Sequence, residues 1–210
     1  TTSRLSLVRN PEVERSAPSV ETLRARVHDA VDAALETTQS LSSRSSVSYR
    51  QAERELRDAV FAIGRALIVL FLGLREEQVM AAHPAALATR YQGMFRTLRK
   101  APPIARSLTT LFGVVRYFRC YLREVKDGER HGCHPLDVSL GLTADRMSWN
   151  VLMLAAQLAT KMAFAEARST LSTFVPDAPS TEVIEKTVLG LHQHAAAFVE
   201  QAPAPEGDGE

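Results

Sequence analysis

Apolar residues recur at helical spacing over two long stretches in the first half of the chain. The first stretch begins at Val20, and the serine-rich run 40–46 interrupts it. The second stretch ends before Pro84. The pattern therefore predicts two helices. Their apolar stripes contain Leu23, Val27, Val31 and Leu35 in the first helix, and Ala52, Leu56, Val60, Ile63, Leu67 and Leu70 in the second.

Two interpretations of these stripes stay open. The two helices form an antiparallel hairpin around their own core, or they present a seam to a second copy of the chain. The charged residues Glu53, Arg54, Glu55 and Arg57 are compatible with both arrangements. We favour the hairpin.

Residues 88–134 change in character. Thr, Val, Tyr and Phe are enriched there, and Pro102 and Pro103 exclude a continuous helix. We expect strands near 90–98, 105–112 and 114–125, with a bend or bulge at Gly113 and a turn over 126–130. On the last strand, alternation places Tyr117, Arg119, Tyr121 and Arg123 on one face.

Helical spacing returns after Pro135 and predicts three helices. Thr143 is the expected N-cap of the first, Pro176 ends the second, and Ser180 caps the third. The second and third helices with the turn between them are similar to a helix-turn-helix, which would place the third helix in a DNA groove. Plain helix packing fits the composition better, because two acids stand among the exposed residues of its first turns, which are Thr181, Glu182, Glu185 and Lys186.

Together these patterns predict a mainly α fold with a small antiparallel β element. We expect an N-terminal helical hairpin, a central three-stranded basic sheet and a C-terminal three-helix, helix-turn-helix-like bundle. The expected segments are a flexible leader at 1–19, the helical hairpin at 20–87, the basic β element at 88–134, the helical domain at 135–201 and a linker tail at 202–210.

The formal net charge of +1 hides a polarised chain. Residues 86–126 carry nine Lys or Arg and one acid, Glu124, whereas residues 127–210 carry five basic and twelve acidic residues. A basic segment with interleaved aromatic residues attracts phosphate backbones. A solvated strand face without a ligand explains the same composition, and charge alone does not separate the two.

Composition limits the setting of the protein. Two cysteines among 210 residues make no disulfide framework, which is typical of a reducing cytoplasm. The N-terminus has no apolar signal core, and the longest apolar run, 66–72, is much shorter than the roughly 20 residues that a bilayer requires. We therefore expect a cytoplasmic protein with no membrane contact.

Motifs for common catalytic sites are missing from the sequence. It has no glycine-rich phosphate loop, no Gly-x-Ser-x-Gly and no His-Glu-x-x-His. The residues of zinc-binding type, Cys120, His131, Cys133 and His134, have unsuitable spacing, because ten residues separate the first two. We expect no metal, no cofactor and no catalytic residue in this chain.

Several segments resemble the N-terminal part of the ISKra group of bacterial insertion-sequence transposases. The resemblance covers about residues 55–210, with the same motif order. The segments that carry it are Ala101–Val125, His134–Arg146, Phe164–Leu171 and Pro179–Gly190.

The resemblance implies DNA transposition by an RNase H-like domain whose catalytic carboxylates would lie beyond residue 210. The chain is then an end-recognition region that binds double-stranded DNA at transposon ends, is associated with the nucleoid and is itself no enzyme. A helical self-association module that forms a homodimer is the alternative, and a complete enzyme of unknown type is a third. The expected DNA-binding residues are Arg96, Arg99, Lys100, Arg106, Arg116, Tyr117, Arg119, Tyr121, Arg123, Lys126, Thr181 and Lys186.

Overall fold

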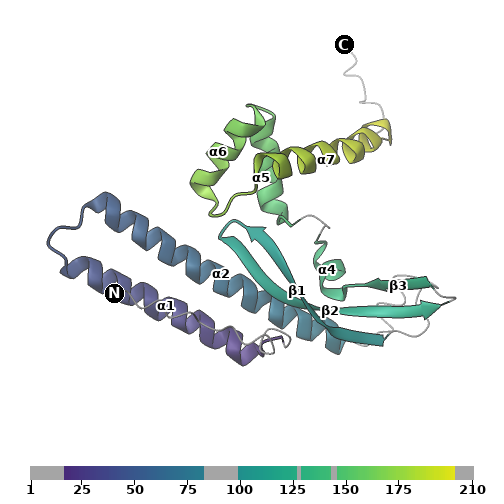
Figure 1. Ribbon diagram of the computed structural model, residues 1–210, viewed down its shortest axis with the longest axis horizontal. Coiled ribbons are helices and arrows are strands. Elements are labelled where there is room, and N and C mark those ends of the chain that lie inside the picture. Colours follow the sequence, from purple (N-terminus) through teal and green to yellow (C-terminus); the bar gives the residue numbers. More distant parts are fainter. Residues whose placement is uncertain (1–16, 83–98, 127–128, 143–145, 202–210) are drawn as a thin grey trace, which may run out of the picture. The chain divides into compact units, whose positions relative to one another are not determined.

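The computed structural model describes residues 17–82, 99–126, 129–142 and 146–201. The expected strand at 90–98, the linker tail and most of the leader lie outside these ranges. Within them the chain forms six helices and one three-stranded antiparallel sheet, so the predicted mainly α fold with a small β element is confirmed (Figure 1). The chain divides into two compact units. Residues 1–108 and 115–143 form one, and residues 109–114 and 144–210 form the other.

Two long helices form an antiparallel hairpin in the first unit (Figure 1). Helix α1 spans Val20–Ser43 and α2 spans Tyr49–Ala81. Each begins at a serine whose hydroxyl accepts a hydrogen bond from the main chain, Ser19 from Thr22 N and Ser48 from Gln51 N, both at 3.2 Å. The serine-rich run does not end α1 at residue 40, because the hydroxyls of Ser42 and Ser43 donate to carbonyls three residues earlier and remain within the helix.

The sheet has the strand order β1-β2-β3. Strand β1 spans Arg99–Thr110, β2 spans Gly113–Lys126 and β3 spans Glu129–Cys133. A two-residue turn joins β1 to β2, and the glycine that begins β2 has φ of 102°, a conformation that residues with a Cβ rarely adopt. Strand β3 pairs antiparallel with β2, from Leu122 opposite Cys133 to Lys126 opposite Glu129.

Pro102 and Pro103 exclude a helix, as expected, but two other expectations for the sheet were wrong. The strand expected near 105–112 begins at Arg99 and includes both prolines, which are tolerated because β1 is an edge strand and needs fewer N–H donors. The segment 126–130, expected to be a turn, contains the end of β2 and the start of β3. Strand β3 is short and has few apolar residues, and it was missed because pairing with β2, rather than its own composition, stabilises it.

A short helix, α4 (Pro135–Leu140), follows the sheet and packs against α2. Its Leu136 is completely buried in a core that α2 and the sheet also line. The other members of this core are Leu72, Leu108, Val115 and Tyr117. The sequence pattern did not predict α4, because six residues are too few to show helical periodicity.

The second unit is built around three helices, α5 (Trp149–Ala159), α6 (Phe164–Phe174) and α7 (Thr181–Gln201). All three pack on one another, as expected for the C-terminal bundle. The turn between β1 and β2 joins this unit through a short parallel bridge, in which Thr109 N donates to Arg146 O at 2.7 Å and Ser148 N donates to Thr109 O at 2.8 Å. The buried core contains Met147, Val151, Leu152, Ala155, Leu171, Val175 and Ile184.

Local predictions for this bundle were partly correct. Ser180 caps α7 as expected, with its hydroxyl accepting from Val183 N at 3.4 Å. The first helix, however, begins at Trp149 with Ser148 as its cap, because the preceding residues form the bridge to Thr109. The apolar spacing of the second helix predicts that Phe174 points inward, but this last residue of α6 is 62% exposed.

Candidate functional site

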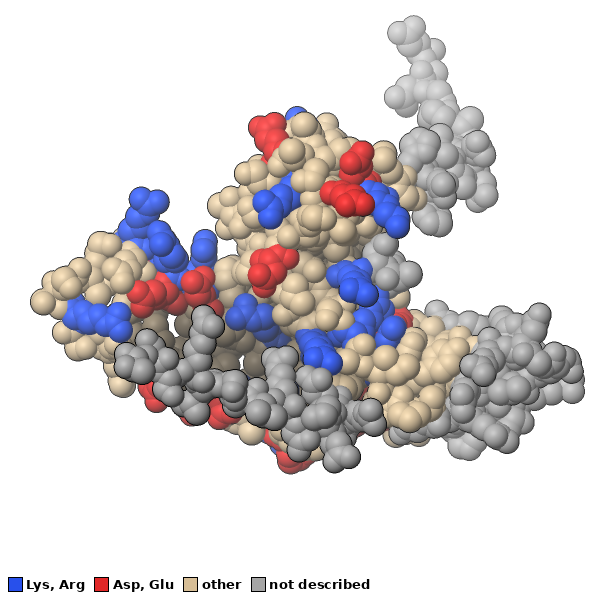
Figure 2. Space-filling view, in the orientation of Figure 1, with Lys and Arg blue, Asp and Glu red and all other residues tan. Residues whose placement is uncertain are grey.

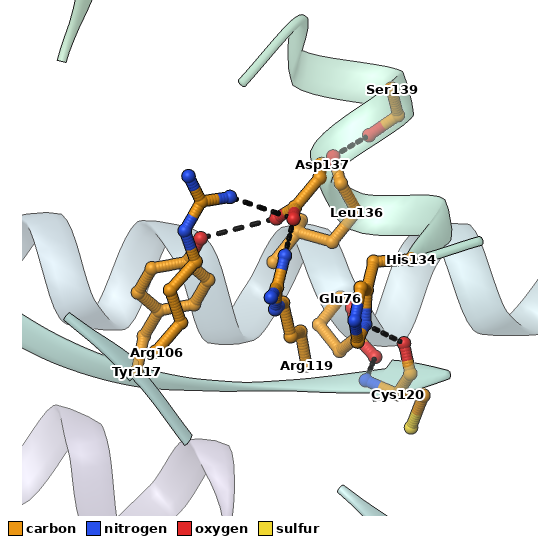
Figure 3. A network of polar contacts seen from close by, with 9 residues as sticks. All are labelled: Glu76, Arg106, Tyr117, Arg119, Cys120, His134, Leu136, Asp137 and Ser139. Atoms are coloured by element: carbon orange, nitrogen blue, oxygen red, sulfur yellow. Dashed lines mark hydrogen bonds and ion pairs between the residues drawn. The ribbon is translucent and has the colours of Figure 1, made fainter. Parts of the chain in front are cut away.

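A network of charged side chains joins β1, β2 and α4 in the first unit (Figure 3). The carboxylate of Asp137 accepts a hydrogen bond from Arg106 Nη1 at 2.7 Å and another from Tyr117 Oη at 3.1 Å. It also forms an ion pair with Arg119. The side chains of Arg106, Arg119 and Asp137 are only 8%, 17% and 12% exposed. Two consecutive strands and the helix that follows the sheet therefore meet at one buried acid.

The start of α4 fixes the position of Asp137. Pro135 begins the helix, where its missing N–H costs nothing, and Asp137 lies in the first turn, where the helix dipole favours a negative charge. The helix ends after one and a half turns at Gly141, whose φ is 63°, and the N–H of Leu142 donates to the carbonyl of Asp137 at 2.8 Å. This compact turn directs the carboxylate toward β1 and β2.

A second set of contacts attaches the middle of β2 to its surroundings. The N–H of Cys120 donates to Glu76 Oε1 of α2 at 2.7 Å, and the carbonyl of Cys120 lies 2.9 Å from His134 Nδ1 (Figure 3). The His134 ring also contacts the Tyr121 ring, with centroids 5.0 Å apart. Within the described residues, two buried atoms of this region, Glu76 Oε2 and Arg119 Nε, have no hydrogen-bond partner.

Burial changes the acidity of three of these groups. It raises the pKa of Tyr117, although the positive charges of Arg106 and Arg119 oppose this change. Burial lowers the pKa of Arg119. It also lowers the pKa of His134, and the two arginines act in the same direction while the hydrogen bond to the Cys120 carbonyl opposes them.

The chemical consequence is a structural role for this network. A carboxylate that is held by two guanidinium groups and a phenol already uses its lone pairs, so it is a poor proton acceptor for a substrate. The arginines likewise use their charge internally. We conclude that the network holds β1, β2 and α4 in a fixed arrangement.

The structure places the expected DNA-binding residues in different surroundings. Arg106, Tyr117 and Arg119 are turned inward toward Asp137. Tyr117 and Arg119 share one face of β2, as strand alternation predicted, but that part of the face is buried rather than open to phosphate. Arg116 is exposed on β2, whereas Tyr121 is half-buried against His134. Arg96 lies outside the described residues.

Four of the expected residues share one end of the sheet. Arg99 and Lys100 begin β1, and Arg123 and Lys126 lie in the last residues of β2. Arg130, which was not among the expected residues, lies near the start of β3 at the same end. Antiparallel pairing brings these positions together, since Lys126 pairs with Glu129 and Val125 pairs with Arg130. Two acidic positions, Glu124 and Glu129, share this end. Within the described residues, the backbone therefore gathers five basic and two acidic positions at this end.

The third helix of the second unit carries a mixed surface. Thr181 is half-buried, and the exposed Lys186 follows two exposed acids, Glu182 and Glu185. On the face drawn in Figure 2, acidic and basic side chains lie next to one another over this unit. The first turns of α7 therefore carry charges of both signs.

The residues of zinc-binding type do not gather in the described part of the chain. His134 Nδ1 is engaged by the carbonyl of Cys120, and the half-buried Cys133 has a pKa that burial raises. Among the described residues, no group of three or more His, Cys, Asp or Glu side chains could hold a metal ion. The side chain of His131 is outside the described set.

A cavity of about 280 Å³ lies in the first unit between the start of α1, α2 and β2. Its lining mixes apolar side chains such as Leu23 with charges of both signs, including Arg26, Glu77 and Arg116. Such a mixed lining does not select one class of ligand.

Sequence reasoning missed Asp137 and Glu76, which organise the network. Asp137 lies 31 positions from Arg106, and Glu76 lies 44 positions from Cys120, so no local spacing connects them. The one available signal was the acid in the first turn after Pro135, which indicates a helix start.

No helix in the described part of the chain combines the length and apolar character needed to cross a membrane. Comparison with known proteins adds no identity, because neither a protein-family model nor a curated protein matches this chain.

Proposed function

We propose that this chain is a non-catalytic region of an ISKra-group transposase that binds double-stranded DNA at transposon ends. The proposed phosphate-binding surface is the end of the sheet that gathers Arg99, Lys100, Arg123, Lys126 and Arg130, and we call it the basic sheet end. The observation that carries DNA binding is the convergence of these positions by strand pairing. The transposase family rests on the sequence resemblance alone.

The physical argument is electrostatic. Among the described positions of this end, five are basic and two are acidic, and the charge stays positive when Asp127, which follows Lys126 in the sequence, is counted. Phosphate contacts of this kind give affinity without base specificity. Arg106 and Arg119 contribute indirectly, because their ion pairs with Asp137 fix β1 against β2 and so fix the spacing of the basic sheet end. Thr181 and Lys186 on α7 would then add secondary contacts, and catalysis and the nucleoid location would belong to the complete transposase.

Fluorescence anisotropy with a duplex DNA at several salt concentrations tests this proposal. We expect affinity to fall steeply as salt rises, and the double variant Arg123→Gln/Lys126→Gln to reduce the salt slope by about 2. The matched control is Arg50→Gln/Arg54→Gln, which removes the same charge from exposed positions on α2. Equal effects of the two double variants, or affinity independent of salt, would exclude the basic sheet end as the DNA contact.

A second candidate function is self-association without DNA contact. The observation that favours it is an exposed apolar surface on the helical hairpin, which includes Val60, Leu67 and Phe71. Sedimentation velocity of the 210-residue chain with and without duplex DNA separates the candidates. A dimer that ignores DNA supports the second, and a chain that stays monomeric while binding DNA supports the first.

A further inference from the structure

Helix α2 has three different faces. One face packs on the sheet and α4, where Leu72 is 3% exposed. A second face packs on α1 so closely that a Cβ on Gly73 would overlap the Leu23 side chain. The third face is apolar and is left uncovered by the described residues. Its members are Leu56, Val60, Leu67, Phe71 and Leu74, which are 36%, 59%, 49%, 51% and 37% exposed.

These five residues make a continuous stripe. Each residue of an α-helix is rotated by about 100° from the previous one, so the five fall within an arc of about 60°. The half-buried Ile63 lies at the edge of this arc, and no charged residue between Leu56 and Leu74 falls inside it. Such spacing is typical of a helix seam that packs against another helix.

Helix α1 widens the apolar surface. Its Val31 and Leu35 are 37% and 57% exposed. Leu35 follows Leu23 by twelve residues, and Val60 precedes Gly73 by thirteen, so the contact between Leu23 and Gly73 places Leu35 and Val60 at about the same level. Both are rotated in the same sense from that contact by about 120–140°. Because the two helices run in opposite directions, equal rotations bring both side chains to the same side of the hairpin.

The size of this surface matches an interface. Seven large apolar residues that are each about one third to three fifths exposed present on the order of 600 Å², at the upper limit of apolar patches on monomers and near the roughly 800 Å² that each partner buries in a standard interface. A second molecule with a matching surface would bury on the order of 1,200 Å² in total, which is the lower limit of specific interfaces.

We propose that a second copy of the chain covers this face, with its α2 antiparallel to the first. The apolar stripe of α2 can pair with the same stripe of a second copy when the two-fold axis lies between Ile63 and Leu67. A two-fold axis there places Leu56 opposite Leu74 of the other copy, and the smaller Val60 opposite the larger Phe71. A parallel pair would instead align the two helix dipoles, which is unfavourable.

This inference deepens the self-association function, and a charge-exchange experiment tests it. Sedimentation velocity and light scattering follow the 210-residue chain over a range of concentrations without DNA. We expect a dimer for the unsubstituted chain, and Val60→Glu or Phe71→Lys alone to raise its dissociation constant by more than about tenfold. The double variant Val60→Glu/Phe71→Lys should restore the dimer, because each new acid meets a new base only across an antiparallel pair.

The control variant is Leu189→Glu, which changes an equally exposed leucine (56%) on α7 and should leave the dimer intact. Far-UV circular dichroism verifies that each variant is folded. A chain that is monomeric at every concentration would overturn both self-association and this interface. A dimer that tolerates Val60→Glu, or a double variant that stays dissociated, would overturn the antiparallel interface and leave self-association standing.

Discussion

Asp137 is the acid that balances two buried arginines, so its replacement by asparagine tests the role of the network directly. The asparagine keeps the shape and one oxygen that can accept a hydrogen bond, and it removes the charge. Arg106 and Arg119, with side chains 8% and 17% exposed, would then be left as buried positive charges facing each other. Breaking a buried ion pair in this way costs about 3–5 kcal/mol. Since a domain is stable by about 5–15 kcal/mol in total, much of the stability of the first unit would be lost.

Urea denaturation followed by far-UV circular dichroism measures the loss, and hydrogen exchange detected by mass spectrometry locates it. We expect faster exchange in α2, β2 and α4, and unchanged exchange in α5, α6 and α7. The matched control is Asp58→Asn, which removes the acid of an exposed ion pair. The side chains of this pair, Arg57 and Asp58, are 52% and 65% exposed. That change should cost less than about 1 kcal/mol. If Asp137→Asn costs no more than this control, the network is not what holds the unit together.

Three further predictions concern other contacts. Burial lowers the pKa of His134 from 6.5, so the unfolded chain binds a proton more readily than the folded chain. The free energy of unfolding should therefore fall as pH drops below about 6.5. His134→Asn should weaken this pH dependence, which urea titrations at pH 5 and 7 measure. Gly132→Ala should lower the free energy of unfolding by about 1–3 kcal/mol, because the new Cβ would overlap Tyr121 Oη and the backbone. Gly190→Ala on α7 should raise it by about 1 kcal/mol, because alanine favours a helix more than glycine does. Thermal unfolding that ranks the two variants in the opposite order would contradict this prediction. Ser148→Ala should cost about 1 kcal/mol through loss of its bond from Val151 N, and an unchanged melting temperature would show that this cap contributes nothing.

Long periodic elements could be predicted from the sequence because their signal repeats. Both helices of the hairpin and the two last helices of the bundle have several turns with one apolar stripe, and capping serines such as Ser180 mark where a helix starts. Short elements lack such repetition. Helix α4 and strand β3 have six and five residues, and both were missed. The strand expected at 114–125 was found at Gly113–Lys126, whereas the one expected near 105–112 begins earlier, at Arg99.

The expected DNA-binding site was harder to predict, because the sequence does not say whether a charged side chain points to solvent or into the interior. Arg106 and Arg119 look the same along the chain as Arg116, yet the first two pair with a buried acid and the third is exposed. An arginine counts as a surface charge only if no acid from a distant segment neutralises it. That condition depends on how the elements pack.

The sequence by itself determined the helical hairpin, the small basic sheet and the C-terminal helices, because periodicity and capping act between near neighbours along the chain. Only the tertiary structure decided which arginines are internal, where Asp137 lies and which face of α2 is uncovered. These properties arise from contacts between segments that are distant in sequence, such as the 31 positions between Arg106 and Asp137. Local sequence patterns do not report contacts between distant segments, so the structural role of these residues could be assigned only from the folded chain.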